Sequence, residues 1–266
     1  MSRSLSSHNR RSVVKPPIMI IYGTKGIGKT TMAAGAPNPV LLAIEDGVGL
    51  LDVPHWNNIA SFGDVIEALG ALYSEEHDRK TLIVDSLDWL EPLVWQEACS
   101  RNGWSSIEAP DYGKGYVAAL YVWREYIDGI RALRDETGMT IVQIAHNSIK
   151  RFDSPEHPSY DRHQIKVHEK ASALLQEHAD VVGFLTYRVS TTEQDVGFNK
   201  KVTRAVGGGN RVLYTAERPA YIAKNRLSLP HAIDLPTKPQ AWENPAEIWE
   251  ALAKHLPNGT TVKQEQ

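Results

Sequence analysis

Cysteine is almost absent from this chain. The single residue, Cys99, can form no disulfide within the chain, and metal sites built from cysteine pairs are excluded. Long apolar runs are also missing, because no stretch approaches the ~20 residues that a membrane-spanning helix needs. The first fifteen residues lack the apolar core of a secretory signal. Together these absences predict a protein of the reducing cytoplasm that has no membrane partner.

An excess of charge of one sign is likewise missing. Lys and Arg number 29 against 32 Asp and Glu, which is a formal net charge of −3. The surface as a whole therefore attracts nucleic acid weakly, and contact with DNA or RNA needs a local basic patch. The Ser- and Arg-rich residues 1–15 are predicted to form a disordered basic arm.

What the chain does contain is an ordinary globular balance, with 42% hydrophobic and 23% charged residues, over a length that suits one α/β domain. Short β-branched runs alternate with segments of helical periodicity as far as residue 187. This alternation predicts a mostly parallel, twisted sheet with helices on both faces, followed by antiparallel edge strands. Strands are predicted at 18–22, 40–44, 81–84, 140–145, 181–187, 201–206, 211–215 and 220–224, and helices at 29–35, 63–73, 116–134, 169–178 and 245–256.

The clearest motif is glycine-rich and occupies residues 23–30, with the sequence GTKGIGKT. It matches the P-loop pattern G-x-x-x-x-G-K-[ST] in full, between a predicted buried strand and a predicted helix. Glycines let backbone N–H groups turn inward around phosphates. Lys29 is predicted to reach the β- and γ-phosphates, and Thr30 to offer its hydroxyl to Mg²⁺. The sequence therefore predicts an ATP and Mg²⁺ site formed by Gly23, Thr24, Lys25, Gly26, Ile27, Gly28, Lys29, Thr30 and Thr31.

Two carboxylates at strand ends are predicted to complete this site. Asp85 ends an apolar strand and is expected beside the P-loop, where it can hold the magnesium, usually through water. Glu45 ends another early strand and is predicted to orient and deprotonate the attacking water, because ligands of open α/β sheets bind at the ends of the strands. Asp46 competes for that role, although an Asp before Gly47 is also typical of a turn.

The P-loop, Glu45, Asp85 and the strand at 141–147 occur in the order found in RecA-like ATPases, and the chain resembles that superfamily from about residue 18 to residue 226. The closest resemblance is to the small phage-encoded RecA-type ATPases of single-strand annealing and recombination, the Sak group. This resemblance implies a bacterial host cytoplasm. In RecA-like proteins a polar residue after the fourth strand, most often Gln, senses the γ-phosphate. His146 corresponds to it, with a buried core histidine as the alternative, and Gln143 is a weaker candidate.

The segment Lys224-Asn225-Arg226 resembles the Lys-Asn-Arg element of RadA and of DnaB-type helicases. This resemblance implies that Lys224 and Arg226 reach the nucleotide of a neighbouring subunit in a ring or filament. Residues i and i+2 of a strand point the same way, so both cations could neutralise developing phosphate charge. An exposed basic strand end is the alternative.

RecA-like proteins also place two mobile loops against DNA, and the corresponding stretches here are residues 102–115 and 147–166. Both stretches interleave cations with aromatic rings. Such a composition suits single-stranded nucleic acid, because cations follow the backbone and rings stack on bases. Ordinary solvated loops are the alternative. The predicted contacts are Lys114, Lys150, Arg151, Phe152, Arg162 and Lys166.

The sequence thus predicts a RecA-like ATPase domain over residues 16–240, followed by a C-terminal helix and polar tail over residues 241–266. The leading hypothesis is an ATP-dependent DNA recombination protein that assembles on single-stranded DNA and promotes annealing or strand exchange, with DNA-stimulated hydrolysis at subunit interfaces. A single-strand DNA-binding protein is a further candidate partner. The alternatives are a helicase loader or replication motor, a nucleotide-gated binding module with little turnover, and a metabolic kinase.

Overall fold

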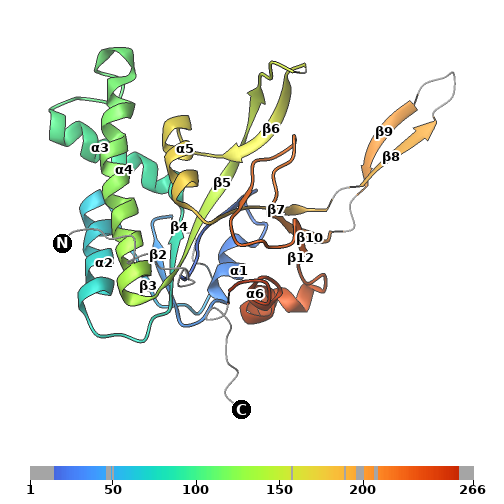
Figure 1. The fold of residues 1–266 in the computed structure, drawn as a ribbon, viewed down its shortest axis with the longest axis horizontal. Helices are drawn as coiled ribbons and strands as arrows, with labels where there is room; N and C mark the ends of the chain where they lie inside the picture. The colour runs from blue at the N-terminus through green and yellow to red at the C-terminus, as the bar shows by residue number, and fades with distance from the viewer. Residues whose placement is uncertain are drawn as a thin grey trace, which may run out of the picture.

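The computed structural model describes residues 15–45, 49, 51–156, 158–188, 190–195, 201–206 and 209–257. A ten-stranded sheet crosses the molecule, and helices lie against both of its faces (Figure 1). No helix in this part of the chain is both long and apolar enough to cross a membrane. The predicted N-terminal arm lies outside the described residues except for Lys15, and so does the tail from residue 258.

Five parallel strands form the centre of the sheet, in the order β7-β1-β5-β4-β2. This order confirms the predicted mostly parallel sheet, and it places β5 between the P-loop strand β1 and the strand β4 that carries Asp85. A short strand, β3, extends the sheet beyond β2 in the same direction. The bounds are Ile18–Gly23 (β1), Pro39–Ala43 (β2), His55–Trp56 (β3), Thr81–Asp85 (β4), Thr140–Phe152 (β5) and Val181–Tyr187 (β7).

The C-terminal part of the chain adds the predicted antiparallel edge. Strand β10 (Arg211–Tyr214) pairs with β7, and β12 (Ala232–Asp234) pairs with β10. The strand predicted at 220–224 is reduced to β11 (Lys224–Asn225), which pairs with the first residues of β7. Strands β8 (Ser190–Asp195) and β9 (Lys201–Val206) form a separate two-stranded sheet.

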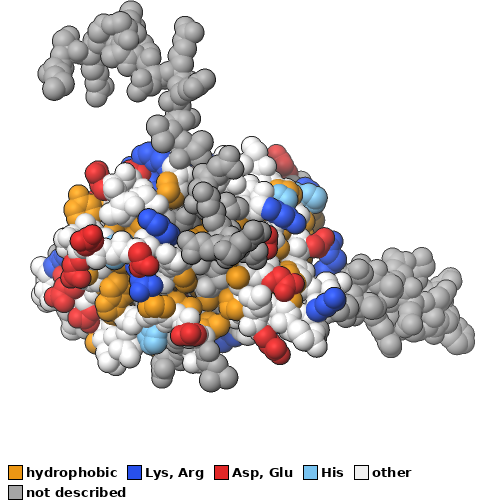
Figure 2. Space-filling view, turned by 90° about the horizontal axis from the view of Figure 1, so that it is seen from below, with side chains coloured by type: hydrophobic (Ala, Val, Ile, Leu, Met, Phe, Trp, Pro, Cys, Tyr) orange, Lys and Arg blue, Asp and Glu red, His pale blue; other side chains and the backbone are white. Residues whose placement is uncertain are grey.

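Helices cover the two faces unequally. Side chains alternate along β1, so that Ile18, Ile20 and Tyr22 enter the core beneath the larger helical layer, while Met19 and Ile21 enter the core beneath the smaller one. On the side of the molecule seen from below, acidic and basic side chains are interspersed (Figure 2). The larger layer contains α2 (Phe62–Ser74), α3 (Leu87–Asn102), α4 (Lys114–Ala132) and α5 (Glu169–His178), and the smaller layer contains α1 (Lys29–Ala34) and α6 (Pro245–Ala253).

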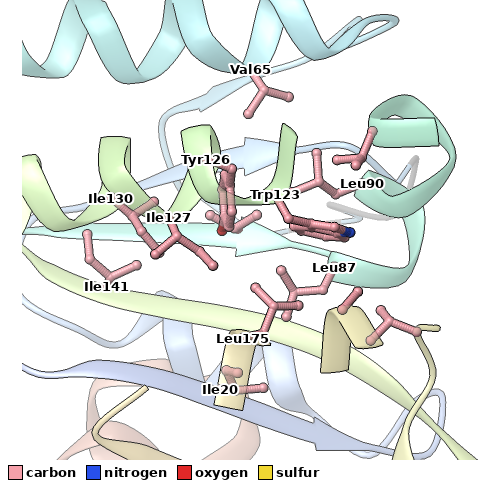
Figure 3. Close-up of a cluster of buried hydrophobic side chains, with 14 of the residues drawn as sticks. Ile20, Val65, Leu87, Leu90, Trp123, Tyr126, Ile127, Ile130, Ile141 and Leu175 are labelled. Atoms are coloured by element: carbon pink, nitrogen blue, oxygen red, sulfur yellow. The ribbon is translucent and has the colours of Figure 1, made fainter. Parts of the chain in front are cut away.

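The larger core is built on one face of α4. Trp123, Tyr126, Ile127 and Ile130 point from this helix into a cluster that also receives side chains from α2, α3, α5 and the sheet (Figure 3). All four are at most 1% exposed. This face of the helix predicted at 116–134 is therefore a packing surface, and Trp123 belongs to it.

The stretch after Ala145 differs from its prediction. Strand β5 continues to Phe152 and pairs antiparallel with β6 (Tyr160–Ile165), from Asn147 opposite Ile165 to Phe152 opposite Tyr160. The prediction of a loop at 147–166 is therefore wrong. This β5–β6 hairpin projects from the body of the sheet (Figure 1), so its residues lack the apolar alternation that marks a half-buried strand. Residues 103–110 do form a loop, between α3 and the short helical turn Asp111–Gly113.

A buried carboxyl joins α3 to the start of α5. Glu91 is 7% exposed, and its Oε1 accepts a hydrogen bond from the backbone N–H of His168 at 2.8 Å. Burial raises the pKa of Glu91 from 4.5 to about 7, and the His168 hydrogen bond only partly opposes this. Since the pKa of Glu91 is higher in the folded state than in the unfolded state, its contribution to stability is fully present below pH 4.5. This contribution is lost as the pH rises from 4.5 through 7.

We expect Glu91→Gln to remove this pH dependence, because the amide oxygen can accept the same hydrogen bond without a charge. The free energy of unfolding of the wild type should fall relative to that of the variant by about 3 kcal/mol between pH 4.5 and pH 8. Urea titrations at both pH values measure the difference. A constant gap between the two proteins would contradict the assignment.

Candidate active site

The P-loop begins where β1 ends. Gly26 has a φ of 71° and Gly28 a φ of 100°, a left-handed conformation that residues with a Cβ rarely adopt. Helix α1 starts directly afterwards at Lys29, with Gly28 as its N-cap. This conformation is that of a loop whose backbone N–H groups can face a phosphate.

Lys29 is turned back onto this loop. Its Nζ donates to the carbonyl oxygens of Gly23 at 3.1 Å and Thr24 at 3.0 Å, and the residue is 6% exposed. Burial lowers the pKa of Lys29, while the nearby carboxylates of Asp85, Asp88 and Glu45 act in the opposite direction. Phosphate oxygens are stronger acceptors than these two carbonyls, so the ammonium fits a phosphate partner.

Thr30, in α1, and Asp85, at the end of β4, meet although β1 and β4 are not neighbours in the sheet. The hydroxyl of Thr30 donates to Oδ2 of Asp85 at 2.7 Å, although β5 lies between β1 and β4. Burial raises the pKa of Asp85, and the hydrogen bond from Thr30 opposes that shift. A hydroxyl and a carboxylate are oxygen ligands that suit Mg²⁺. No group of three or more His, Cys, Asp or Glu residues able to hold a metal occurs within the described ranges, so the remaining ligands would be phosphate oxygens and water.

Glu45 lies next to the end of β4, just after β2. The backbone N–H groups of Ile44 and Glu45 donate to the carbonyl of Asp85 at 2.8 and 3.0 Å. The hydroxyl of Ser86 approaches the Glu45 carboxylate at 3.4 Å. These contacts hold Glu45 beside the Thr30–Asp85 pair, as a general base would require. Its competitor Asp46 lies outside the described residues.

His146 lies beside the P-loop because β5 pairs with β1 in a register that places Gly23 opposite His146. Its Nδ1 is 2.9 Å from Oδ2 of Asp88 and 3.8 Å from Oε2 of Glu45. The sequence did not single out Asp88, since nothing in its position on α3 indicates which strand it will face. Gln143 points into the core, where its Oε1 accepts a hydrogen bond from Tyr126 at 3.0 Å.

With the exception of Asp88 and Gln143, the site residues described above surround one cavity of about 350 Å³. It brings together the P-loop, both predicted strand-end carboxylates and His146, as well as Leu51, which the sequence did not indicate. Ile27 packs into the smaller core instead of facing the cavity. The lining residues are Lys25, Gly26, Gly28, Lys29, Thr30, Thr31, Glu45, Leu51, Asp85 and His146.

A family model for the AAA domain matches residues 15–227, which is most of the chain. The protein belongs to this family. Membership agrees with the P-loop ATPase type of fold seen here, and it indicates nucleotide-dependent activity, typically with Mg²⁺. No curated protein matches the chain.

Lys224 and Arg226, which the sequence predicts to reach a neighbouring nucleotide, do not line this cavity. Lys224 Nζ donates to the carbonyl oxygens of Gln176 at 2.5 Å and Glu177 at 3.1 Å, at the end of α5, and Arg226 is exposed. Lys224 pairs with Val182, as does Ile20, so it lies about 10 Å from Gly23 along the strand direction, and β7 separates it from β1. Neither cation therefore completes the site of its own chain.

The predicted nucleic-acid residues also occupy different environments. Lys114 begins α4 and is exposed, as are Lys150 and Arg151 on the β5–β6 hairpin, and Phe152 is half-buried against Tyr160. Lys166 lies at the base of the hairpin and is also exposed. The prediction for Arg162 needs correction: its side chain is 7% exposed and paired with Glu217 at 2.6 Å, so it faces the protein instead of solvent.

Trp242, in the C-terminal segment, packs against Gly28 of the P-loop. A Cβ added to Gly28 would lie 2.1 Å from Cζ3 of Trp242. The indole donates to the carbonyl of Pro236 at 2.9 Å, and the guanidinium of Arg211 lies 3.6 Å from a Trp242 ring centroid. The indole is therefore fixed from two further sides, and Gly28 is required for space as well as for its φ.

We expect Gly28→Ala to lower the free energy of unfolding by more than the ~1–2 kcal/mol of a left-handed alanine, because the indole must also move. Gly26→Ala is the matched control, since no atom lies within 4 Å of its added Cβ and only the backbone strain remains. Trp242→Ala should reduce the difference between the two alanine variants in urea unfolding. An unchanged difference would show that Trp242 does not restrict Gly28.

Proposed function

We propose that this AAA domain is an ATP-dependent DNA recombination protein that binds single-stranded DNA and promotes annealing or strand exchange. The observation that carries the proposal is the path of β5. His146 on this strand lines the nucleotide cavity, and the same strand continues into the β5–β6 hairpin, where Lys150 and Arg151 are exposed. Loss of the terminal phosphate beside His146 would therefore act on the same strand that carries the exposed Lys150 and Arg151.

The cavity supports hydrolysis of a nucleoside triphosphate. The P-loop backbone and Lys29 would bind the phosphates, and Thr30 with Asp85 would hold Mg²⁺, which neutralises charge on the phosphate oxygens. Glu45 is positioned to accept a proton from the attacking water. Its link to Asp85 through the Ile44 and Glu45 amides keeps base and metal ligand at a constant separation.

The hairpin supports contact with single-stranded DNA. Lys150 and Arg151 supply charge for the phosphate backbone, Ile149 is 63% exposed beside them, and Phe152 lies next in the strand. Lys166 continues the basic surface to the base of the hairpin, and Lys114 is a further candidate contact on α4. These residues are our candidates for the local patch that a chain of net charge −3 requires, although Arg151 also lies 3.3 Å from Asp153.

The separation of Lys224 and Arg226 from their own P-loop supports assembly into a ring or filament. In such an assembly these cations would approach the nucleotide of the next subunit, as in the RecA-type ATPases of single-strand annealing that the sequence resembles. A single-strand DNA-binding protein is a further proposed partner.

The decisive test is steady-state phosphate release from ATP and Mg²⁺, with and without single-stranded DNA. We expect DNA to stimulate release, and Lys29→Ala to abolish it because the phosphates lose their buried cation. Lys150→Ala with Arg151→Ala should weaken DNA binding, and the slope of log affinity against log salt should become shallower by about 1.4, at about 0.7 per phosphate contact. ATP binding should remain unchanged.

The matched control is Arg79→Ala with Lys80→Ala, which removes the same charge just before β4, at the amino-terminal end of the parallel strands and away from the hairpin. It should leave the salt slope as in the wild type. An equal loss from both double variants would contradict the hairpin surface. Phosphate release without DNA stimulation would favour a helicase loader, and ATP binding without release would favour a nucleotide-gated module.

Completion of the site by a neighbour has a separate test. Arg226→Ala and Lys29→Ala should each be inactive alone, but an equimolar mixture should recover about a quarter of wild-type activity. One interface type in four then combines an intact P-loop with an intact Arg226, provided that the subunits mix at random and act independently. Phosphate release measured after mixing checks this expectation. A mixture that remains inactive, although the subunits exchange, would contradict a role for Arg226 in the neighbouring site.

A further inference from the structure

We propose that Asp88 is a positioning residue of the nucleotide site, which fixes the ring of His146 so that Nε2 faces the terminal phosphate and ties that ring to the base of the β5–β6 hairpin. The inference rests on the proposed function, because it assigns the ligand of His146 as the terminal phosphate of ATP. It concerns a residue that contacts His146 without lining the cavity itself.

Asp88 holds both the main chain and the ring of His146. It lies in the first turn of α3, and its side chain is 4% exposed. Oδ1 accepts the backbone N–H of His146 at 2.9 Å, and Oδ2 lies 2.9 Å from ring Nδ1. Because both oxygens bind the same residue, the ring cannot rotate without breaking a charge-assisted hydrogen bond.

This arrangement determines where the ring proton lies. Burial acts to raise the pKa of Asp88, but the hydrogen bonds from His146 outweigh it and hold the pKa below its usual value. The ionised carboxylate only accepts hydrogen bonds, so Nδ1 carries a proton. Nε2 is then the nitrogen left for a ligand, and within the described residues it has no hydrogen-bond partner.

The cation of the cavity, Lys29, favours a bound anion beside the ring, whereas the nearby carboxylates oppose one. Lys29 lies across the cavity, Glu45 approaches Nδ1 at 3.8 Å, and Asp85 is held by Thr30. A ring protonated on both nitrogens would bridge Asp88 to a phosphate oxygen through Nε2–H. That hydrogen bond is available to a terminal phosphate in this cavity and is lost when the phosphate leaves.

Asp88 also lies where His146 meets the hairpin. The carbonyl of His146 accepts a hydrogen bond from the backbone N–H of Lys166 at 2.9 Å, and Lys166 Nζ is 3.9 Å from Oδ2 of Asp88. The ion pair is partly exposed and contributes little by itself. The backbone contact is the stronger link, and through it the position of His146 determines the position of the hairpin base.

The substitution Asp88→Asn tests the proton placement. The backbone N–H of His146 is a permanent donor and would take the single amide oxygen. The amide NH₂ would then face Nδ1, which must become an acceptor, so the ring proton moves to Nε2. Imidazole ¹⁵N spectra with Mg²⁺ and a non-hydrolysable ATP analogue should show protonated Nδ1 in the wild type and unprotonated Nδ1 in the variant. Loss of the signal in His146→Gln identifies it among the ten histidines. Spectra of His146 that do not differ between wild type and variant would overturn the proposal.

Kinetics separate positioning from a general effect on folding. Asp88→Asn should lower kcat by about tenfold and leave the KM for ATP within about twofold. The Asn amide leaves the ring neutral, and the ring Nε2–H is a weaker donor to the terminal phosphate than a charge-assisted one beside an ionised Asp88. In the His146→Gln background the same substitution should change kcat by less than about twofold, since an amide has no tautomer to set. Equal losses in both backgrounds would show that Asp88 is only structural.

The matched control is Asp64→Asn. Asp64 also lies in the first turn of a helix and binds backbone N–H groups there, but it is remote from the cavity. Its substitution should leave kcat unchanged. A wild-type chain without turnover but with the expected ¹⁵N shifts would refute the proposed hydrolysis and support the role of Asp88. Turnover with unaltered shifts would refute only the role of Asp88.

Discussion

The parallel register of β1, β5, β4 and β2 is the constraint on which the site depends. It places Gly23 beside His146, and Asp85 beside both Ile144 and Ala43. Each of the site residues follows from where its strand ends: the P-loop after β1, Glu45 after β2 and Asp85 at the end of β4. A slip of one residue in any of these pairs would exchange the side chains that enter the two cores, so the packing that fixes the fold also fixes the geometry of the site.

Charge in the cavity is balanced by contacts within the chain. Lys29 is buried among Asp85, Asp88 and Glu45, which compensate for part of its desolvation. Asp85 is held by Thr30 and Asp88 by His146. Buried ionised groups are tolerated only when they are paired in this way. The same pairing keeps the cations and carboxylates at defined positions before a ligand arrives, which is the condition for electrostatic catalysis.

Helix α3 connects this site to the rest of the larger helical layer. Ser86, its N-cap, contacts Glu45, Asp88 contacts His146, and Glu91 holds the start of α5. Three successive polar contacts thus run from the cavity along one helix whose apolar residues Leu87, Leu90 and Val94 lie in the core. Helix α3 forms although Pro92 lies within it, because the tertiary packing of the helix outweighs the low intrinsic helix preference of proline.

The sequence alone determined the α/β class, the P-loop and the strand ends that carry Glu45 and Asp85, because these depend on local patterns of short range. Tertiary structure decided the contacts between distant segments: Asp88 with His146, Trp242 behind Gly28, and Arg162 buried against Glu217. It also decided that residues 147–152 and 160–165 pair as a hairpin, since only Arg162 and Ile165 of these strands are buried and they leave no periodic apolar signal. Helix periodicity predicted that α4 packs on the sheet, but side-chain pairing across the sheet requires a register that no single segment contains.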